Sequence, residues 1–255
     1  MINFIILSPL EQFEVLNLIS INAPILGHFN LALTNLSLYT LLVLSILIGF
    51  HVLGNNDVRL IPSKWSIALE STYASILSMV REQIGSHSEE YFPLIYSVFF
   101  FIIVANLTGN VPYNFTIGTS IIVSLGLSIT VFIAVTVIGL TKHKLAFFSF
   151  FIPAGTPLLL TPVLTLIELV SYFARAFSLG VRLLANLAAG HSLLKILSTF
   201  LAQMFTSSIF MAIFTLLPFT IFLAIVGLEI GVSIVQAYVF SLLMCSYIRD
   251  AIELH

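Results

Sequence analysis

The chain has 255 residues, of which 59% are hydrophobic and only 8% are charged, and its formal net charge at pH 7 is −2. Because a soluble domain carries about 25% charged residues, this composition predicts an integral membrane protein. The slightly negative charge argues against a nucleic-acid partner, and no glycine- and lysine-containing loop for nucleotide phosphates is present. A single cysteine, Cys245, excludes a disulfide framework and a cluster of metal-binding thiolates. We therefore expect no cofactor and no metal.

Gaps between the charged side chains predict an all-α protein with about five membrane helices, with 1–255 as one membrane domain. Residues 1–32 form an N-terminal segment, and the first span follows at 33–53, close to the roughly 20 residues that a bilayer requires. A helical hairpin is predicted at 91–140, with its turn in the sequence ANLTGNVPY. Prolines and a glycine within 145–162 then interrupt helical structure.

Residues 63–84, between the first span and the hairpin, have the periodicity of an amphipathic helix. At about 100° per residue, apolar and polar side chains fall on opposite sides. The apolar side holds Trp65, Leu69, Tyr73, Ile76, Met79 and Val80, and the polar side holds Lys64, Ser71, Ser75, Ser78 and Glu82. The tryptophan near one end favours a helix that lies in the membrane surface. Docking against a soluble subunit is the alternative, and the low charge of the polar side argues against it.

Two much longer helices are predicted within 157–250. Residues 162–200 contain no proline after Pro162, and Pro218 precedes the second helix at 219–248. These stretches extend about 58 Å and about 45 Å, well beyond a hydrocarbon thickness of about 30 Å. We therefore expect both helices to lie steeply tilted, as a pair that wraps a curved partner. The distribution of lysine and arginine among the loops places the N-terminus outside and the C-terminus on the positive side.

Arg182 lies within an apolar stretch of the first long helix, SLGVRLLANLAAGH. Its guanidinium stays protonated at any working pH, and a fixed charge in hydrocarbon costs at least about 3 kcal/mol. The side chains three and four positions away are not acidic: Ser178, Leu179, Ala185 and Asn186. The counter-charge must therefore come from elsewhere. A structural salt bridge to Glu168 or Glu229 is one possibility, and a carboxylate of another chain is the other.

Other polar residues of the same helix accompany this arginine. Glu168, Arg175 and Arg182 are spaced by seven and share one face, with Asn186 close to it. His191, nine positions beyond Arg182, projects from the opposite side. Structural alternatives remain open for each: a structural contact with Glu168 or Ser171 for Arg175, an interhelical hydrogen bond for Asn186, and a solvated helix end for His191.

The last helix carries Glu229 alone among apolar residues, with Ser233 and Gln236 four and seven positions further on. A carboxylate, a hydroxyl and an amide on one face form a polar track, and carboxylates inside membranes mostly serve ion pathways. Gln236 has the same interhelical alternative as other membrane amides. Asp250 lies near the end of this helix, at the positive-side boundary.

These motifs resemble those of a known family, subunit a of the F-type ATP synthase. SLGVRLLANLAAGH is similar to the signature of that family, and VGLEIGVSIVQAYVFSLL is similar to its last-helix signature. SPLEQFEV near the N-terminus and SYIRDAIELH at the C-terminus resemble the mitochondrial, fungal form. The resemblance covers essentially the whole chain in order.

The resemblance implies a proton-conducting stator beside a rotating ring of c subunits, with Arg182 between two offset half-channels. It assigns Glu229, His191, Gln236 and Asn186 to the half-channel from the intermembrane space, Glu168 and Asp250 to the one toward the matrix, and secondary roles to Arg175 and Ser233. Bacterial relatives carry an acid at the position of His191 and a histidine at that of Glu229, so details do not transfer between branches.

The same resemblance implies the mitochondrial inner membrane as the location, with the N-terminus toward the intermembrane space and the C-terminus toward the matrix. It adds the lipid bilayer, peripheral-stalk subunits and small membrane subunits as partners, and it implies removal of residues 1–7. Two other functions stay open from the residues alone. A standalone secondary transporter or ion channel would conduct in liposomes without partners, and a purely structural subunit would affect assembly but not conduction.

Overall fold

The computed structural model describes residues 8–23, 29–54, 62–85, 88–112, 114–151, 160–207 and 209–252. In chain order its elements are η1 (Glu11–Phe13), β1 (Asn17–Ala23), β2 (Phe29–Thr34), α1 (Asn35–Gly54), α2 (Lys64–Ile84), α3 (Ser88–Gly109), η4 (Ile117–Thr119), α4 (Ile121–His143), η5 (Lys144–Phe151), α5 (Thr161–Ser207), α6 (Ile209–Phe214) and α7 (Leu216–Ile252). Five helices among the described residues are long and apolar enough to cross a membrane. The predicted all-α membrane fold is therefore confirmed. The predicted removal of residues 1–7 falls outside the described part of the chain.

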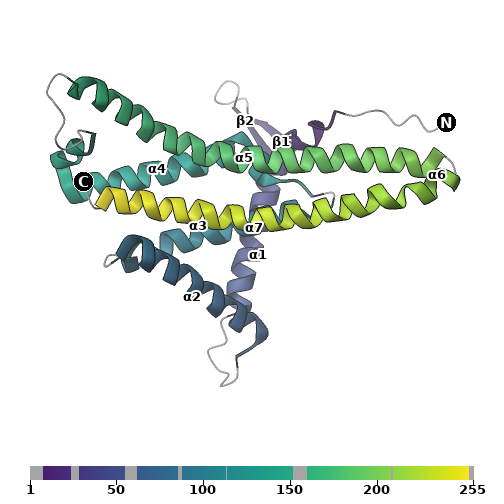
Figure 1. The fold of residues 1–255 in the computed structure, drawn as a ribbon, viewed down its shortest axis with the longest axis horizontal. Coiled ribbons are helices and arrows are strands. Elements are labelled where there is room, and N and C mark those ends of the chain that lie inside the picture. The colour runs from purple at the N-terminus through teal and green to yellow at the C-terminus, as the bar shows by residue number, and fades with distance from the viewer. Residues whose placement is uncertain are drawn as a thin grey trace.

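α5 and α7 lie side by side and run in opposite directions along the longest dimension of the molecule, with α6 between them at one end (Figure 1). They contain 47 and 37 residues, which correspond to about 70 Å and about 55 Å of helix. Both helices are longer than the predicted stretches 162–200 and 219–248: α5 continues to Ser207, and α7 begins at Leu216, ahead of Pro218, and continues to Ile252. Pro162 and Pro218 lie in the first turns, where a proline removes no intrahelical hydrogen bond.

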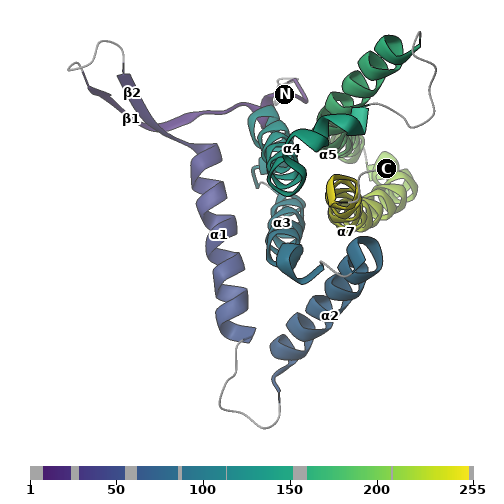
Figure 2. The ribbon, with the colours of Figure 1, turned by 90° about the vertical axis from the view of Figure 1, so that its left-hand side faces the viewer.

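α1 lies at the edge of the bundle, where it packs against α2 and α3, and it runs across the direction of the α5–α7 pair (Figures 1 and 2). Its start differs from the predicted first span at 33–53, because residues 29–34 pair with β1 as an antiparallel hairpin that the sequence analysis did not predict. Asn35 fixes the boundary between strand and helix. Its side-chain oxygen accepts hydrogen bonds from the backbone N–H of Leu16, at 3.2 Å, and of Leu36, at 2.8 Å.

α2 confirms the helix predicted at 63–84, and Ser63 caps its start by accepting a hydrogen bond from the backbone N–H of Ser66 at 3.2 Å. Its apolar side is divided between two environments. The half toward the C-terminus packs against α3 and α7, and buries Ile76, Met79, Val80 and Ile84. The other half exposes Trp65 and Tyr73. Much of the apolar side is thus covered by this chain itself, an arrangement that the sequence analysis did not consider.

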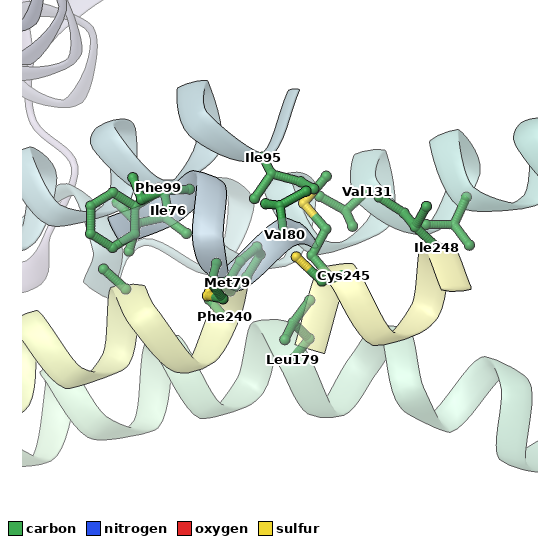
Figure 3. Packing of buried hydrophobic residues seen from close by; sticks show 14 of the residues in the cluster. Ile76, Met79, Val80, Ile95, Phe99, Val131, Leu179, Phe240, Cys245 and Ile248 are labelled. Carbon is green, nitrogen blue, oxygen red and sulfur yellow. The ribbon is translucent and has the colours of Figure 1, made fainter. Parts of the chain in front are cut away.

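Side chains from α2, α3, α4, α5 and α7 meet in one apolar core (Figure 3). Phe240, Cys245 and Ile248 of α7 are completely buried at its centre, so Cys245 is a buried apolar side chain. This core holds the C-terminal half of α7 in a fixed position beside α5.

α4 and α5 approach each other closely at Gly180. A Cβ atom at this position would lie 2.9 Å from Leu125 Cδ2 and 3.0 Å from the backbone oxygen of Ser124. One turn away, the hydroxyl of Ser128 donates a hydrogen bond to the backbone oxygen of Ala176. Small residues allow this backbone approach, as is common between membrane helices.

Gly180→Ala should therefore separate α4 from α5 and destabilise the membrane domain by about 1–3 kcal/mol, the usual cost of overpacking. The measurement is the thermal unfolding midpoint of the purified complex in detergent. Gly126→Ala on α4 is the matched control, because a Cβ atom there meets nothing within 4 Å and alanine favours helix. Equal midpoints for the two variants would contradict the close approach at Gly180.

Candidate functional site

The predicted polar residues of α5 and α7 lie at three successive levels along the helix pair. Arg175 marks the first level, Arg182 the second and His191 the third. Seven and nine residues separate them, or about 10 Å and about 14 Å along α5. Because α7 runs antiparallel to α5, its residues Asp250, Gln236 and Glu229 meet these levels in reverse order.

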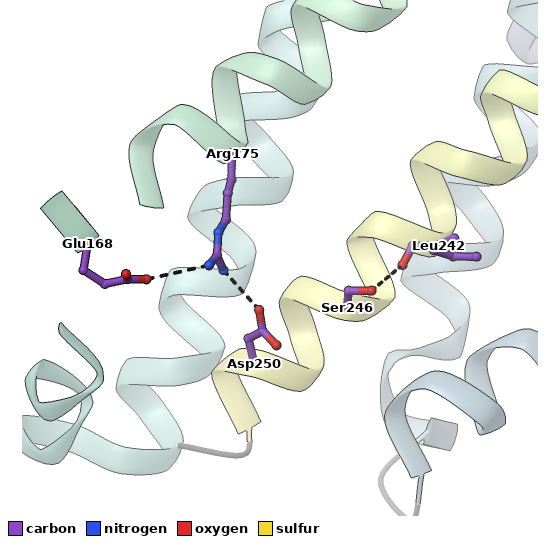
Figure 4. A network of polar contacts seen from close by, with 5 residues as sticks. All are labelled: Glu168, Arg175, Leu242, Ser246 and Asp250. Carbon is purple, nitrogen blue, oxygen red and sulfur yellow. Dashed lines mark hydrogen bonds and ion pairs between the residues drawn. The ribbon is translucent and has the colours of Figure 1, made fainter. Parts of the chain in front are cut away.

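The first level is a group of three charges, Glu168, Arg175 and Asp250, called here the Arg175 cluster (Figure 4). Arg175 Nη1 lies 3.1 Å from Asp250 Oδ2, and its Nη2 lies 3.7 Å from Glu168 Oε1. The guanidinium also lies 6.0 Å from the ring centroid of Tyr247. All three charged side chains are about one-third exposed. The ion pair with Glu168, left open by the sequence, is present, and Asp250 is a second partner that the spacing on α5 did not predict.

The second level contains Arg182, whose side chain is exposed on the surface of the α5–α7 pair. It forms no ion pair with any residue that the structure describes. The predicted alternative of a salt bridge to Glu168 or Glu229 is therefore not found. Next to it, Asn186 Nδ2 donates a long hydrogen bond of 3.5 Å to Gln236 Oε1, which joins the two helices at this level. Arg182 is thus presented outward with room for a partner.

The third level is a buried acid–base pair. His191 Nδ1 lies 3.4 Å from Glu229 Oε1, and the two side chains are only 13% and 9% exposed. Gly190 makes space for the carboxylate, since a Cβ atom there would lie 2.8 Å from Glu229 Oε1. His191 Nε2 and Glu229 Oε1 have no hydrogen-bond partner among the described residues. Buried polar atoms usually have partners, and such atoms mark a place where water or a transferred proton can be accommodated.

Two asparagines at the C-terminal end of α3 contact Ser233 of α7, and neither was predicted as a site residue: Asn106 lies within α3, and Asn110 directly follows it. The side chain of Asn106 is almost completely buried and donates a hydrogen bond of 3.3 Å to the backbone oxygen of Ser233. Asn110 donates to the hydroxyl of Ser233 at 3.0 Å, while its own Oδ1 is buried without a partner in the described chain. The available signal was their spacing of four, which places two amides on one helix face; that stretch was instead interpreted only as a turn.

This geometry separates the titratable groups into two clusters, with one permanently charged side chain between them. The His191–Glu229 pair, which has polar atoms without a hydrogen-bond partner among the described residues, can take up and pass on a proton. The Arg175 cluster offers two carboxylates that can accept a proton. Arg182 can do neither, because it does not release its proton. Among the described residues, no three His, Cys, Asp or Glu side chains come together as a metal site.

Comparison with known proteins identifies the family of this chain. The profile of the family described as ATP synthase A chain matches residues 37–249. ATP synthase subunit a of Mycosarcoma maydis is 61% identical over 252 residues, with 99% of each chain covered. The protein of the same name from Kluyveromyces lactis is 47% identical with both chains covered completely, and that of Marchantia polymorpha is 46% identical, covering 97% of this chain and 99% of its own. The chain therefore belongs to the ATP synthase A chain family.

Proposed function

We propose that this chain, a membrane-sector subunit of ATP synthase, is the stator through which protons reach and leave a rotating ring of c subunits. One observation carries the proposal: the permanent charge of Arg182 is exposed on the α5–α7 surface without an ion-pair partner in the described chain. A charge in such a place needs a carboxylate from another protein. A ring whose subunits each present one carboxylate supplies it transiently, so that Arg182 is never permanently neutralised.

The third level serves as the entry path. Protons pass along Asn110, His191 and Glu229, where the partnerless polar atoms accommodate water. Gln236 and Asn186 then lead toward Arg182. A ring carboxylate that receives this proton becomes neutral and can turn into the lipid without the cost of a buried charge.

The Arg175 cluster serves as the exit path. A ring carboxylic acid that arrives from the lipid releases its proton toward Glu168 and Asp250. Asp250 lies at the end of α7 remote from Glu229, and Glu168 of α5 lies close to it on the other side of Arg175. Arg182 favours the ionised form of the ring carboxylate by its charge. It also blocks direct passage between the paths, since its own proton is not exchangeable.

The energetics require several protons for each ATP. A protonmotive force of about 150–200 mV supplies roughly 3.5–4.6 kcal/mol per proton. We further infer the location to be the mitochondrial inner membrane, with the N-terminus toward the intermembrane space and the C-terminus toward the matrix. Steep tilt of α5 and α7 follows from their length, and a tilted pair can follow the curved outer surface of a ring.

Arg182→Ala should abolish coupled ATP synthesis and allow protons to leak through the membrane sector. Arg182→Lys should also fail to support synthesis, because an ammonium is a point charge that can lose its proton when desolvated. Both are measured as ATP synthesis and passive proton flux in membrane vesicles. Arg81→Ala is the control for loss of a positive charge, since Arg81 only forms an exposed pair with Glu89. Near-normal synthesis in either Arg182 variant would refute the proposal.

Gly190→Ala should slow proton entry without removing any charged group. The added methyl displaces the Glu229 carboxylate, which is the flexible end of a side chain, so folding is little affected. A misplacement that costs about 1.4 kcal/mol at the barrier reduces the rate about tenfold. Proton-driven ATP synthesis at limiting protonmotive force is the measurement. Gly231→Ala is the control, because a Cβ atom there meets nothing within 4 Å; equal rates in the two variants would argue against Glu229 as an entry residue.

Arg175→Gln should impair both stability and proton release, because it leaves the carboxylates of Glu168 and Asp250 close together without a cation. Adding Glu168→Gln to this variant removes one of the two negative charges. If Arg175 acts only as a structural ion pair, the double variant regains both thermal stability and synthesis. We expect it to regain stability alone, since one proton acceptor of the exit path is then missing.

A further inference from the structure

A pocket of about 180 Å³ lies on the molecular surface between α2, α3 and α7, away from the three levels described above. It is lined by Ser71, Thr72, Ser75, Ile76, Phe99 and Tyr238. α2 contributes three hydroxyl groups, whereas α3 and α7 contribute aromatic rings. These three hydroxyls lie on one face of α2, and neither proton path uses them.

The three α2 hydroxyls can accept hydrogen bonds from a ligand, but their own protons are already engaged. Ser71 and Thr72 both donate to the backbone oxygen of Ala68, at 2.9 Å and 2.7 Å. Ser75 donates to the backbone oxygen of Ser71 at 2.9 Å. A hydroxyl has one proton and two acceptor lone pairs, so the pocket presents three acceptor oxygens. A ligand that fits must therefore supply several N–H or O–H donors.

The rest of the pocket narrows the class of ligand. Phe99 and Tyr238 supply aromatic rings, whose faces attract cations. The hydroxyl of Tyr238 forms no hydrogen bond with another described residue and can donate to an anionic oxygen. The three acceptor oxygens of α2, next to the aromatic rings, match a primary ammonium group, which supplies three N–H donors and a positive charge. The hydroxyl donor of Tyr238 matches a phosphate that is joined to that ammonium group.

The position of α2 favours a lipid as the source of that group. α2 connects the end of α1, at Gly54, to the start of α3, at Ser88. Because α1 and α3 are both long and apolar enough to cross the bilayer, α2 lies at the membrane face where α1 ends and α3 begins. Phospholipid headgroups occupy this depth, and the exposed Trp65 of α2 is typical of it. We propose that this pocket binds the ethanolamine phosphate headgroup of phosphatidylethanolamine. The site is independent of the proton paths.

Photo-crosslinking of the intact complex tests this proposal. The complex is reconstituted in nanodiscs with phosphatidylethanolamine that carries a diazirine in its acyl chain, and the labelled peptides of this chain are identified by mass spectrometry. Phosphatidylcholine with the same diazirine is the matched probe, because its quaternary ammonium has no N–H to donate. We expect labelling of the α2, α3 and α7 segments around the pocket to be at least about tenfold stronger with phosphatidylethanolamine, given the strength of hydrogen bonds to charged groups.

The double variant Ser71→Ala and Ser75→Ala should remove this preference, while Ser78→Ala should keep it. Ser78 is a fair control because it is exposed on the same helix and donates to the Ser75 backbone oxygen at 2.9 Å, yet lies outside the pocket. Equal labelling by the two lipids, or labelling that survives loss of both hydroxyls, would overturn the proposal.

Discussion

The arrangement of this protein depends on a single electrostatic constraint: Arg182 is permanently charged and the described chain gives it no carboxylate. An arginine in hydrocarbon ordinarily pairs with an acid of its own protein. Both acids that could do so are engaged elsewhere. Arg175 holds Glu168, and Glu229 lies beside His191. Because Glu168 pairs with Arg175 and Glu229 lies beside His191, neither neutralises Arg182, and its charge can interact with a carboxylate of another protein.

Those pairings depend in turn on close helix packing. Gly180 brings α4 and α5 together, and the fully buried Phe240 and Ile248 fix α7 against the bundle. Gly190 leaves the space that the Glu229 carboxylate occupies. Of these two glycines of α5, Gly180 therefore sets the packing against α4, and Gly190 sets the position of the Glu229 carboxylate. Rigid positioning of this kind is what a proton-transfer site requires.

Much of the fold could be predicted from local sequence, and the errors have physical explanations. Gaps between charges located the five apolar helices, and amphipathic periodicity located α2 within one residue of its start. The hairpin of β1 and β2 was missed because it depends on pairing between two short segments rather than on periodicity within one. The lengths of α5 and α7 were underestimated mainly at their C-terminal ends, which reach Ser207 and Ile252, and at the start of α7, where Pro218 lies inside the first turn.

For the candidate site, the sequence alone determined which groups are present: the fixed charge of Arg182, the lone Glu229 and the polar faces of two long helices. Charge, apolar length and periodicity are local properties, so they can be read without coordinates. Only the tertiary structure decided the pairings, namely Arg175 with Asp250, His191 with Glu229, and two asparagines, Asn106 and Asn110, with Ser233. These contacts join residues 38 to 127 positions apart, and such distances are closed by the packing of whole helices, which no local pattern encodes.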